Sequence, residues 1–182
     1  MVPMRNFSII VATDAKRGIG KSGKLPWQLS GDMKYFRTLT SKAAAGKTNA
    51  VIMGRTTWES IPEKFRPLPQ RLNVVLTRRT DLTFPPGVLS GVDFPQAFDL
   101  IERSSLKSPI DKIFVIGGAK VYQTALSYRE CEALYVTEID QIFACDTFFP
   151  DVRPDFELNQ SGEPRQEGAV SYAFCTYLRK AT

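Results

Sequence analysis

The stretch that decides the fold is Lys112-Ile-Phe-Val-Ile-Gly-Gly-Ala-Lys-Val-Tyr-Gln-Thr-Ala-Leu126. Residues 112–116 are an almost wholly apolar run, typical of a strand that is covered on both faces. Residues 119–126 have helical spacing, and the pair Gly117-Gly118 stands between the two segments. Glycines at such a junction let the backbone approach a diphosphate closely, with the helix N-terminus behind it. The stretch therefore predicts a strand, a glycine turn and a helix, and it is our preferred pyrophosphate site.

Other apolar runs predict further strands of the same sheet. Three of them lie upstream, at residues 7–13, 50–53 and 72–76. Residues 133–139 and 171–178 alternate enough between apolar and polar to predict an antiparallel hairpin at the sheet edge. Helical spacing marks residues 30–40 and 94–103. We expect an α/β fold with a mostly parallel central sheet, an antiparallel C-terminal edge hairpin and helices on both faces.

Two of the predicted strands end in similar polar and basic residues. Gly54-Arg55-Thr56-Thr57 follows the strand at 50–53, and Thr77-Arg78-Arg79 follows the strand at 72–76. Ligands of open α/β sheets bind beyond the carboxyl ends of the strands, so both groups should border one crevice. Free amides, hydroxyls and guanidinium groups converging there suit a phosphate. The alternative for residues 54–57 is an ordinary helix start with an exposed arginine.

The glycine-rich segment 18–23 imitates two nucleotide-binding motifs. It satisfies G-x-G-x-x-G, and residues 15–22 miss the P-loop pattern only in their first glycine. Both motifs need a helix that begins directly at the glycines. Pro26 instead favours an extended Leu25 and prevents a helix there, so we reject both motifs and expect a mobile loop beside a site.

Asp32 is the polar exception on an otherwise apolar helical face. It falls in the first turn of the helix predicted at 30–40, where negative charge is favoured, and Ser30 is the candidate N-cap. The apolar residues on the same arc are Leu29, Met33 and Phe36. One alternative is that Asp32 only complements the helix dipole. The neighbouring Leu25-Pro26-Trp27 and the absence of another carboxylate nearby in sequence favour a chemical role.

Composition narrows the class of protein. The chain has 182 residues, 43% hydrophobic and 24% charged, as expected for one globular domain spanning 1–182. It has three widely spaced cysteines and no histidine, which excludes Ser-His-Asp and Cys-His catalysis and leaves no metal site to predict. No apolar run approaches the roughly 20 residues of a membrane span. We expect a cytoplasmic protein, or an organellar one if a targeting segment has been removed.

The charge is distributed unevenly. Residues 1–90 carry 15 lysines and arginines against 5 acidic residues, a net charge of +10, whereas residues 91–182 carry 9 against 14, a net charge of −5. The basic half therefore predicts an anionic ligand. The basic residues are scattered and no nucleic-acid motif accompanies them, so a small phosphorylated ligand fits better than nucleic acid.

Several of these segments together resemble dihydrofolate reductase. They are Leu25-Pro-Trp27 with Asp32, residues 51–61, Pro67-Leu68 with Arg71, and residues 115–122. The resemblance extends to residues 146–150 and the last strand. Residues 58–62 resemble the eukaryotic type, while aspartate at position 32 is similar to plant, protist and bacterial members. That combination occurs in fusions with thymidylate synthase, which leaves open whether this chain is an excised domain.

The resemblance implies that NADPH reduces 7,8-dihydrofolate to tetrahydrofolate and that antifolates bind. Asp32 would hold N3 and the 2-amino group of the pteridine through paired hydrogen bonds, supported by Thr137. Trp27 would hold a nearby water, and the loop around Leu25 would admit the water that protonates N5. Burial would raise the pKa of Asp32. Arg71 would pair with the α-carboxylate of the folate.

The remaining implied contacts fall into two sets. The substrate set adds Ile10, Val11, Met33, Phe36, Ile61, Leu68, Ile116 and Tyr122. The cofactor set comprises Ala12, Ile19, Gly20, Gly54, Arg55, Thr56, Thr57, Thr77, Arg78, Arg79, Gly117, Gly118, Ala119, Lys120 and Val121. Arginines beside the adenosine ribose predict NADPH over NADH, because a 2′-phosphate needs cationic partners.

Two other functions remain as alternatives. One is a non-catalytic module that binds a nucleotide or RNA, which the basic half makes conceivable. The other is a related reductase on the same fold, such as the pterin-like reductase of riboflavin synthesis. Trp27, Asp32 and Arg71 together argue against the second.

Overall fold

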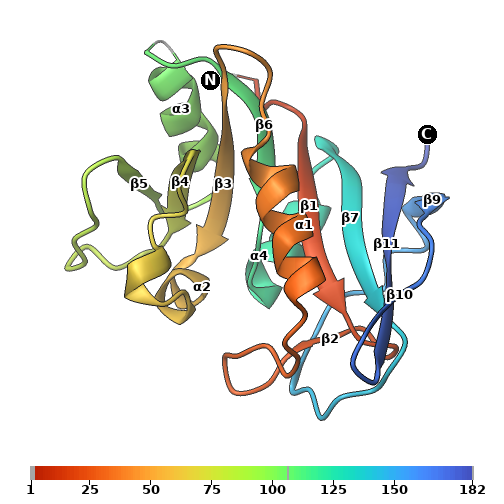
Figure 1. Ribbon diagram of the computed structural model, residues 1–182. Helices are drawn as coiled ribbons and strands as arrows, with labels where there is room; N and C mark the ends of the chain where they lie inside the picture. Colours follow the sequence, from red (N-terminus) through yellow and green to blue (C-terminus); the bar gives the residue numbers. More distant parts are fainter. Residues whose placement is uncertain (1–2, 106, 182) are drawn as a thin grey trace.

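A single large sheet organises the protein (Figure 1). The computed structural model describes residues 3–105 and 107–181. Within them nine strands form the sheet, in the order β10-β11-β7-β1-β6-β3-β4-β5, with β9 also paired to β11. The strands are β1 (Phe7–Thr13), β3 (Thr48–Gly54), β4 (Arg71–Leu76), β5 (Val88–Gly91), β6 (Ile110–Val115), β7 (Cys131–Ile139), β9 (Phe156–Ser161), β10 (Arg165–Glu167) and β11 (Val170–Arg179).

The six strands from β7 to β5 in that order pair in parallel, which confirms the predicted mostly parallel centre. Ala50, Val51, Ile52 and Met53 of β3 are all fully buried. A continuous apolar run is what a strand covered on both faces requires. The strand predicted at 112–116 begins two residues earlier and ends one residue earlier, as β6.

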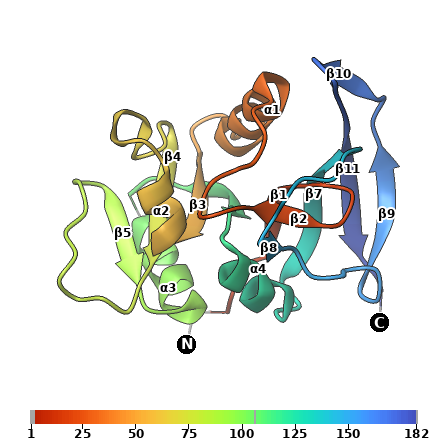
Figure 2. The ribbon, with the colours of Figure 1, turned by 90° about the horizontal axis from the view of Figure 1, so that it is seen from below.

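Helices cover both faces of the sheet, as predicted (Figure 2). On one face lie α1 (Ser30–Ser41) and α2 (Arg55–Ser60), and on the other α3 (Phe94–Ser105) and α4 (Ala119–Leu126). Alternate residues of β1 serve opposite faces: Ile9 packs in the cluster on the α3 and α4 side, and Ile10 in the cluster on the α1 and α2 side. A short 3₁₀ helix, Glu63–Phe65, follows α2.

The C-terminal edge differs from the prediction in one respect. Strands β7 and β11 are antiparallel neighbours, but they are not a hairpin and β11 is not the edge. The chain between them contains β8 (Thr147–Phe148), β9 and β10, and both β9 and β10 line the outer side of β11. Five of the six residues of β9 are exposed, so no buried face marked this strand in the sequence.

The glycine segment 18–23 is not the start of a helix, which confirms that neither nucleotide motif applies. Its first part forms β2 (Gly18–Gly20), which pairs antiparallel with β8. The backbone amide of Ser22 also donates to Asp146, at 2.7 Å. The loop is therefore attached to the segment that follows β7.

No helix among the described residues is long and apolar enough to cross a membrane.

Helix α1 lies close to β11 at its first turn because Gly31 has no side chain. A Cβ at this position would collide with the hydroxyl oxygen of Tyr172, which is itself buried. Tyr35, one turn further along α1, stacks on Phe174 with ring centroids 3.9 Å apart. The glycine and the stacked rings together fix the distance between the helix and the strand.

We therefore expect Gly31→Ala to lower the free energy of unfolding by about 1–3 kcal/mol through overpacking. Helix propensity alone predicts the opposite sign, a gain of about 1 kcal/mol. Urea unfolding of Gly31→Ala, Tyr172→Phe and the double variant measures the difference. Removing the hydroxyl should recover part of the loss, and an equal loss in both backgrounds would contradict the close contact.

Candidate active site

The carboxyl ends of the parallel strands meet at one end of the sheet, and α1 begins there (Figure 1). In Figure 1 this is the lower end, toward which the arrows of β1 and β3 point. The glycine turns, at Gly54 where β3 passes directly into α2 and at Gly117-Gly118 between β6 and α4, lie at the same end. The two predicted halves of the site, Asp32 and the glycine turns, are thus brought to one end of the sheet.

Asp32 is a buried carboxylate, only 8% exposed, in the first turn of α1. The hydroxyl of Thr137 on β7 donates to Asp32 Oδ1 at 2.6 Å. Burial raises the pKa of Asp32, and the negative charge of Glu167 raises it further, while the hydrogen bond from Thr137 opposes the shift. The predicted pairing of Asp32 with Thr137 and the predicted direction of the pKa shift agree with this geometry.

The start of α1 is held differently from the prediction. Ser30 is the first helical residue, Leu29 is the N-cap, and no side chain of the helix caps it. Instead, the backbone amides of Ser30 and Gly31 donate to the carboxylate of Glu167 on β10, at 2.7 and 3.1 Å. The N-cap prediction for Ser30 was therefore wrong, because a carboxylate distant in sequence fills that role.

The apolar arc of α1 is less uniform than its spacing suggests. Leu29 is buried and Phe36 half-buried, but Met33 is 54% exposed. Met33 thus lies at the rim of this face and does not belong to the core. The periodicity predicted the helix correctly but overstated the width of its buried face.

Trp27 is buried beside the start of α1, edge to face with Phe143 at 5.3 Å between ring centroids. Its cluster includes Leu29, and Ala12 of β1 lies against it. The indole Nε1 has no hydrogen-bond partner among the described residues. Leu25, in the loop before it, is 52% exposed. The tryptophan is fixed, whereas the leucine lies in an exposed part of the loop.

The apolar residues predicted to contact substrate divide between the two faces. Five gather on the α1 and α2 side: Ile10, Phe36, Ile61, Leu68 and Ile116. Val11 packs into the cluster on the opposite face, so its side chain does not join them. Tyr122 packs there too, but its buried hydroxyl donates to the Ile10 carbonyl at 2.8 Å. Burial raises the pKa of Tyr122, so this hydroxyl stays protonated.

Arg71, at the amino end of β4, is a buried guanidinium without a carboxylate partner in the described structure. Its Nη1 donates to Thr40 at 2.8 Å and its Nε to the Pro69 carbonyl at 2.9 Å. Burial, with a contribution from Arg37, lowers its pKa to about 10. A buried cation that lacks a counter-charge suits an anionic ligand.

Asp32 and Arg71 therefore lie near opposite ends of α1. Thr40, which holds Arg71, is eight residues after Asp32, a distance of about 12 Å along a helix. The half-buried side chains of the α1 and α2 face lie along this length. The arrangement suits a ligand with a polar head for the carboxylate, an apolar middle and a carboxylate tail.

The two glycine turns contact each other directly. The amide of Gly54 donates to the Gly117 carbonyl at 2.8 Å, and the Gly117–Gly118 peptide is cis. Gly117 has a φ of +116°, a conformation that side chains disfavour. A Cβ on Gly54 would come within 3.0 Å of Val121 Cγ2, and one on Gly118 within 3.3 Å of Thr57 Oγ1. Neither position has room to spare for a Cβ, so glycine lets the ends of β3 and β6 pack closely against the first turns of α2 and α4.

Basic side chains surround these turns but differ in their pairing. Arg55 pairs with Glu59 at 2.6 Å, and Arg79 forms a two-point contact with Asp81. Arg78 and Lys120 are exposed and form no ion pair within the described residues. Of the other residues in the predicted cofactor set, Thr56 and Ala119 lie in the first turns of α2 and α4, Ile19 and Gly20 on β2, and Thr77 directly after β4.

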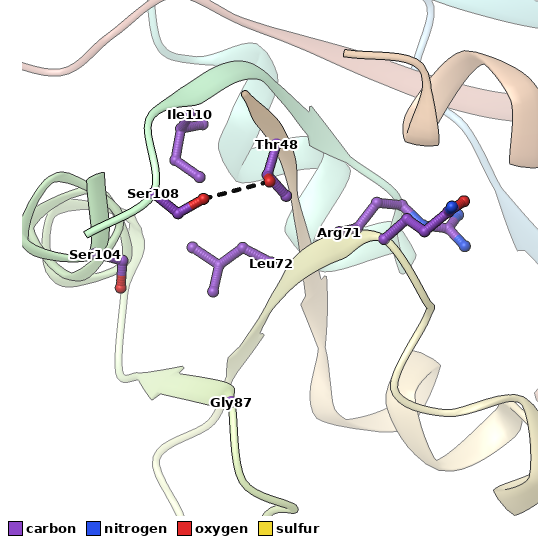
Figure 3. A pocket seen from close by; sticks show the side chains of 8 residues that line it. Thr48, Arg71, Leu72, Gly87, Ser104, Ser108 and Ile110 are labelled. Carbon is purple, nitrogen blue, oxygen red and sulfur yellow. Dashed lines mark hydrogen bonds between the residues drawn. The ribbon is translucent and has the colours of Figure 1, made fainter. Parts of the chain in front are cut away.

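A separate cavity of about 300 Å³ lies at the opposite, amino ends of the strands (Figure 3). Thr48, Leu72 and Ile110, from the starts of three neighbouring strands, line it together with Ser104 and Ser108. The guanidinium of Arg71 is bonded elsewhere, to Thr40 and Pro69. Arg71 nevertheless lines the cavity, and apart from Arg71 the cavity shares no residue with the site described above.

Sequence reasoning missed three acidic residues around the site. Asp14 is buried and accepts the backbone amides of Gly18 and Phe143, which ties the loop after β1 to the segment after β7. Asp146 holds Ser22, and Glu167 holds the start of α1. Asp146 is 124 positions from Ser22 and Glu167 is 137 from Ser30, while Asp14 is four from Gly18 but 129 from Phe143. No short motif marked these contacts in the sequence.

An α/β sheet with a buried carboxylate at the first turn of one helix and paired glycine turns beside it is the arrangement expected from the resemblance to a reductase family. A sequence model described as dihydrofolate reductase matches residues 6–179, and the chain belongs to this family.

Relatives and a solved structure agree with the family assignment. The chain is 43% identical over 181 residues to the bifunctional dihydrofolate reductase-thymidylate synthase of Glycine max, covering 96% of this chain and 34% of that protein. It is 39% identical to the dihydrofolate reductase of Aedes albopictus, covering 96% and 97% of the two chains. The structure of Schistosoma mansoni dihydrofolate reductase matches with a TM-score of 0.86 at 35% identity, covering 98% and 100%. The chain thus spans about a third of the plant relative.

Because the pKa of Asp32 is raised, ionisation of this carboxyl should lower the free energy of unfolding as the pH rises. A carboxyl whose folded pKa is raised contributes full stability below its unfolded pKa and loses it as pH rises through the folded value. Asp32→Asn has no such proton to lose. Its unfolding free energy relative to the wild type should therefore increase from below pH 3.8, the ordinary aspartate pKa, to neutral pH.

Urea unfolding across this pH range measures the effect, with the exposed Asp155→Asn as a matched control. The same pH slope in both variants would show that Asp32 is not destabilised by ionisation.

Proposed function

We propose that this protein reduces 7,8-dihydrofolate to 5,6,7,8-tetrahydrofolate with NADPH. The observation that carries the proposal is the buried Asp32, hydrogen-bonded through one oxygen to Thr137, on the same face as five gathered apolar side chains. Membership of the dihydrofolate reductase family supports it. Plant relatives carry the same region in a bifunctional dihydrofolate reductase-thymidylate synthase. The insect relative is a dihydrofolate reductase of similar length.

Asp32 orients the substrate in this proposal. A planar carboxylate can accept two parallel N–H bonds, which suits N3 and the 2-amino group of a pteridine. Thr137 donates to Oδ1 from a rigid strand and so fixes the rotation of the carboxylate. The raised pKa of Asp32 means that a ligand bringing positive charge is favoured, because it offsets the desolvation of the carboxylate.

The proton for N5 reaches the substrate through water in this proposal. Asp32 grips the opposite side of the pteridine, so it does not deliver the proton itself. The loop that contains the exposed Leu25 is the element that admits water, and the buried Trp27 has an indole N–H available to hold one. Exclusion of other water strengthens the hydrogen bonds at Asp32.

Arg71 anchors the distal end of the substrate. Its position about 12 Å along α1 from Asp32 is compatible with a carboxylate beyond an aromatic linker. The guanidinium is oriented by Thr40 and Pro69 and carries no counter-charge of its own in the described structure. A bidentate pair with the α-carboxylate of folate supplies that charge.

The glycine turns and nearby cations fit a dinucleotide. Gly54, Gly117 and Gly118 carry no side chain, and neighbouring protein atoms leave little room for one. Helix α4 begins directly after Gly118, so a diphosphate can approach the N-terminus of this helix. Arg78 and Lys120 are the exposed cations available for phosphate groups. NADPH, when bound, supplies the hydride.

Loss of NADPH absorbance with dihydrofolate tests the proposal, with Asp32→Asn as the informative variant. The substitution removes the charge but keeps the shape, so hydride transfer should slow by at least about tenfold, while NADPH affinity changes little. No oxidation of NADPH with dihydrofolate above background by the wild type would exclude the dihydrofolate reductase function. Activity with the substrate of the riboflavin-synthesis reductase instead would identify that related enzyme. Equal losses of hydride-transfer rate and NADPH affinity would show that Asp32 does not have the proposed role in substrate binding.

Arg78→Ala should weaken NADPH on the order of tenfold or more and leave NADH nearly unchanged, because a charge-assisted contact to a 2′-phosphate is lost. Fluorescence titration of both cofactors measures the two affinities. Arg103→Ala, an exposed arginine on α3, is the control. Parallel weakening of NADPH and NADH would show that Arg78 does not discriminate between them.

A further inference from the structure

The hairpin formed by β10 and β11 holds the first turn of α1 through several contacts. The carboxylate of Glu167 accepts hydrogen bonds from two backbone amides of the helix, and Tyr172 lies against Gly31. Further along, Tyr35 stacks on Phe174, and the two rings are within 16° of parallel. These contacts come from a segment more than 130 residues away in the chain, since Ser30 and Glu167 are 137 positions apart.

The geometry at Glu167 matches one carboxylate oxygen to one amide. Oε1 accepts from Ser30 at 2.7 Å and Oε2 from Gly31 at 3.1 Å. These are the two residues immediately before Asp32, and α1 has no side-chain cap of its own. Glu167 pairs with Val170 across the tight turn of the hairpin, so its backbone is fixed by the sheet.

We propose that Glu167 is a positioning residue for Asp32: by accepting the amides of Ser30 and Gly31, it fixes the turn of α1 from which Asp32 reaches the substrate. The proposal rests on the proposed function for its effect on dihydrofolate. Its effect on the free protein does not depend on that function. A carboxylate at a helix N-terminus is favoured both by the orphan amides and by the helix dipole.

Glu167 also acts on Asp32 through its charge. The groups that face Asp32 are Thr137 on β7, Tyr35 on α1, Tyr122 on α4, and Tyr172 and Glu167 from the hairpin. Burial raises the pKa of each of these tyrosines, so they are uncharged near neutral pH. The amides of Ser30 and Gly31 lower the pKa of Glu167 and keep it ionised. Among these groups, Glu167 is the one that favours protonation of Asp32 by its charge.

The free protein tests the proposal without any substrate. We compare Glu167→Ala, Glu167→Gln and the control Glu163→Gln, which removes an exposed charge from the segment before β10. Amide exchange at residues 30–32 should quicken on the order of tenfold in Glu167→Ala, because both acceptors are lost, and less in Glu167→Gln, which keeps one. The pKa of Asp32, followed by carbon-13 NMR, should fall in both Glu167 variants and not in the control.

Kinetics then test the link to the site. In Glu167→Ala, kcat/KM for dihydrofolate should fall on the order of tenfold while KM for NADPH stays within about twofold, because only the substrate side is displaced. If Glu167→Ala does not fold, Glu167→Gln carries the same comparison. An unchanged Asp32 pKa and unchanged exchange in both Glu167 variants would overturn the proposal. A wild type that exchanges as expected but does not oxidise NADPH would instead refute the proposed function.

Discussion

The structure depends on keeping one carboxylate buried at the start of a helix. Desolvation alone would push Asp32 toward its neutral form or toward solvent, so its environment has to hold it in place. Thr137 does this from the centre of the sheet by a single hydrogen bond, and α1 supplies the backbone that carries the carboxylate. Because the ionised carboxylate is costly to keep in this buried position, the site favours a ligand that donates N–H bonds and brings positive charge.

Two other buried polar groups also lack the partner that their chemistry requires. Arg71 is buried with hydrogen bonds but no counter-charge in the described structure, and the buried indole Nε1 of Trp27 has no hydrogen-bond partner among the described residues. All three are placed by parallel strands and their connections, which are rigid elements. The ligand therefore meets preorganised partners, and little of its binding free energy is needed to order them.

Much of the fold could be predicted because its signals are local. The fully buried run in β3 and the strand, glycine and helix order around Gly117 were both correct, as were α1 and α3 within two residues. The signals failed where a strand has no buried face, as in β9 with its five exposed residues, and where helical periodicity overstated burial, as at Met33. In the site, Asp32 was named from its place on a helical face, and Thr137 and Arg71 through family resemblance, while Val11 was assigned to a face on which its side chain does not lie.

The sequence by itself determined the mostly parallel sheet and the family, because apolar periodicity and short motifs depend on residues that are neighbours in the chain. The absence of histidine from its composition also excluded Ser-His-Asp and Cys-His catalysis. Only the tertiary structure decided what surrounds Asp32. The sequence predicted a lone carboxylate in a helix whose N-cap is Ser30, yet the fold brings Glu167, 137 positions away, to that helix terminus. Hydrogen bonds and charges act over a few ångströms in space, and the separation of two residues along the chain does not give their distance in the folded protein.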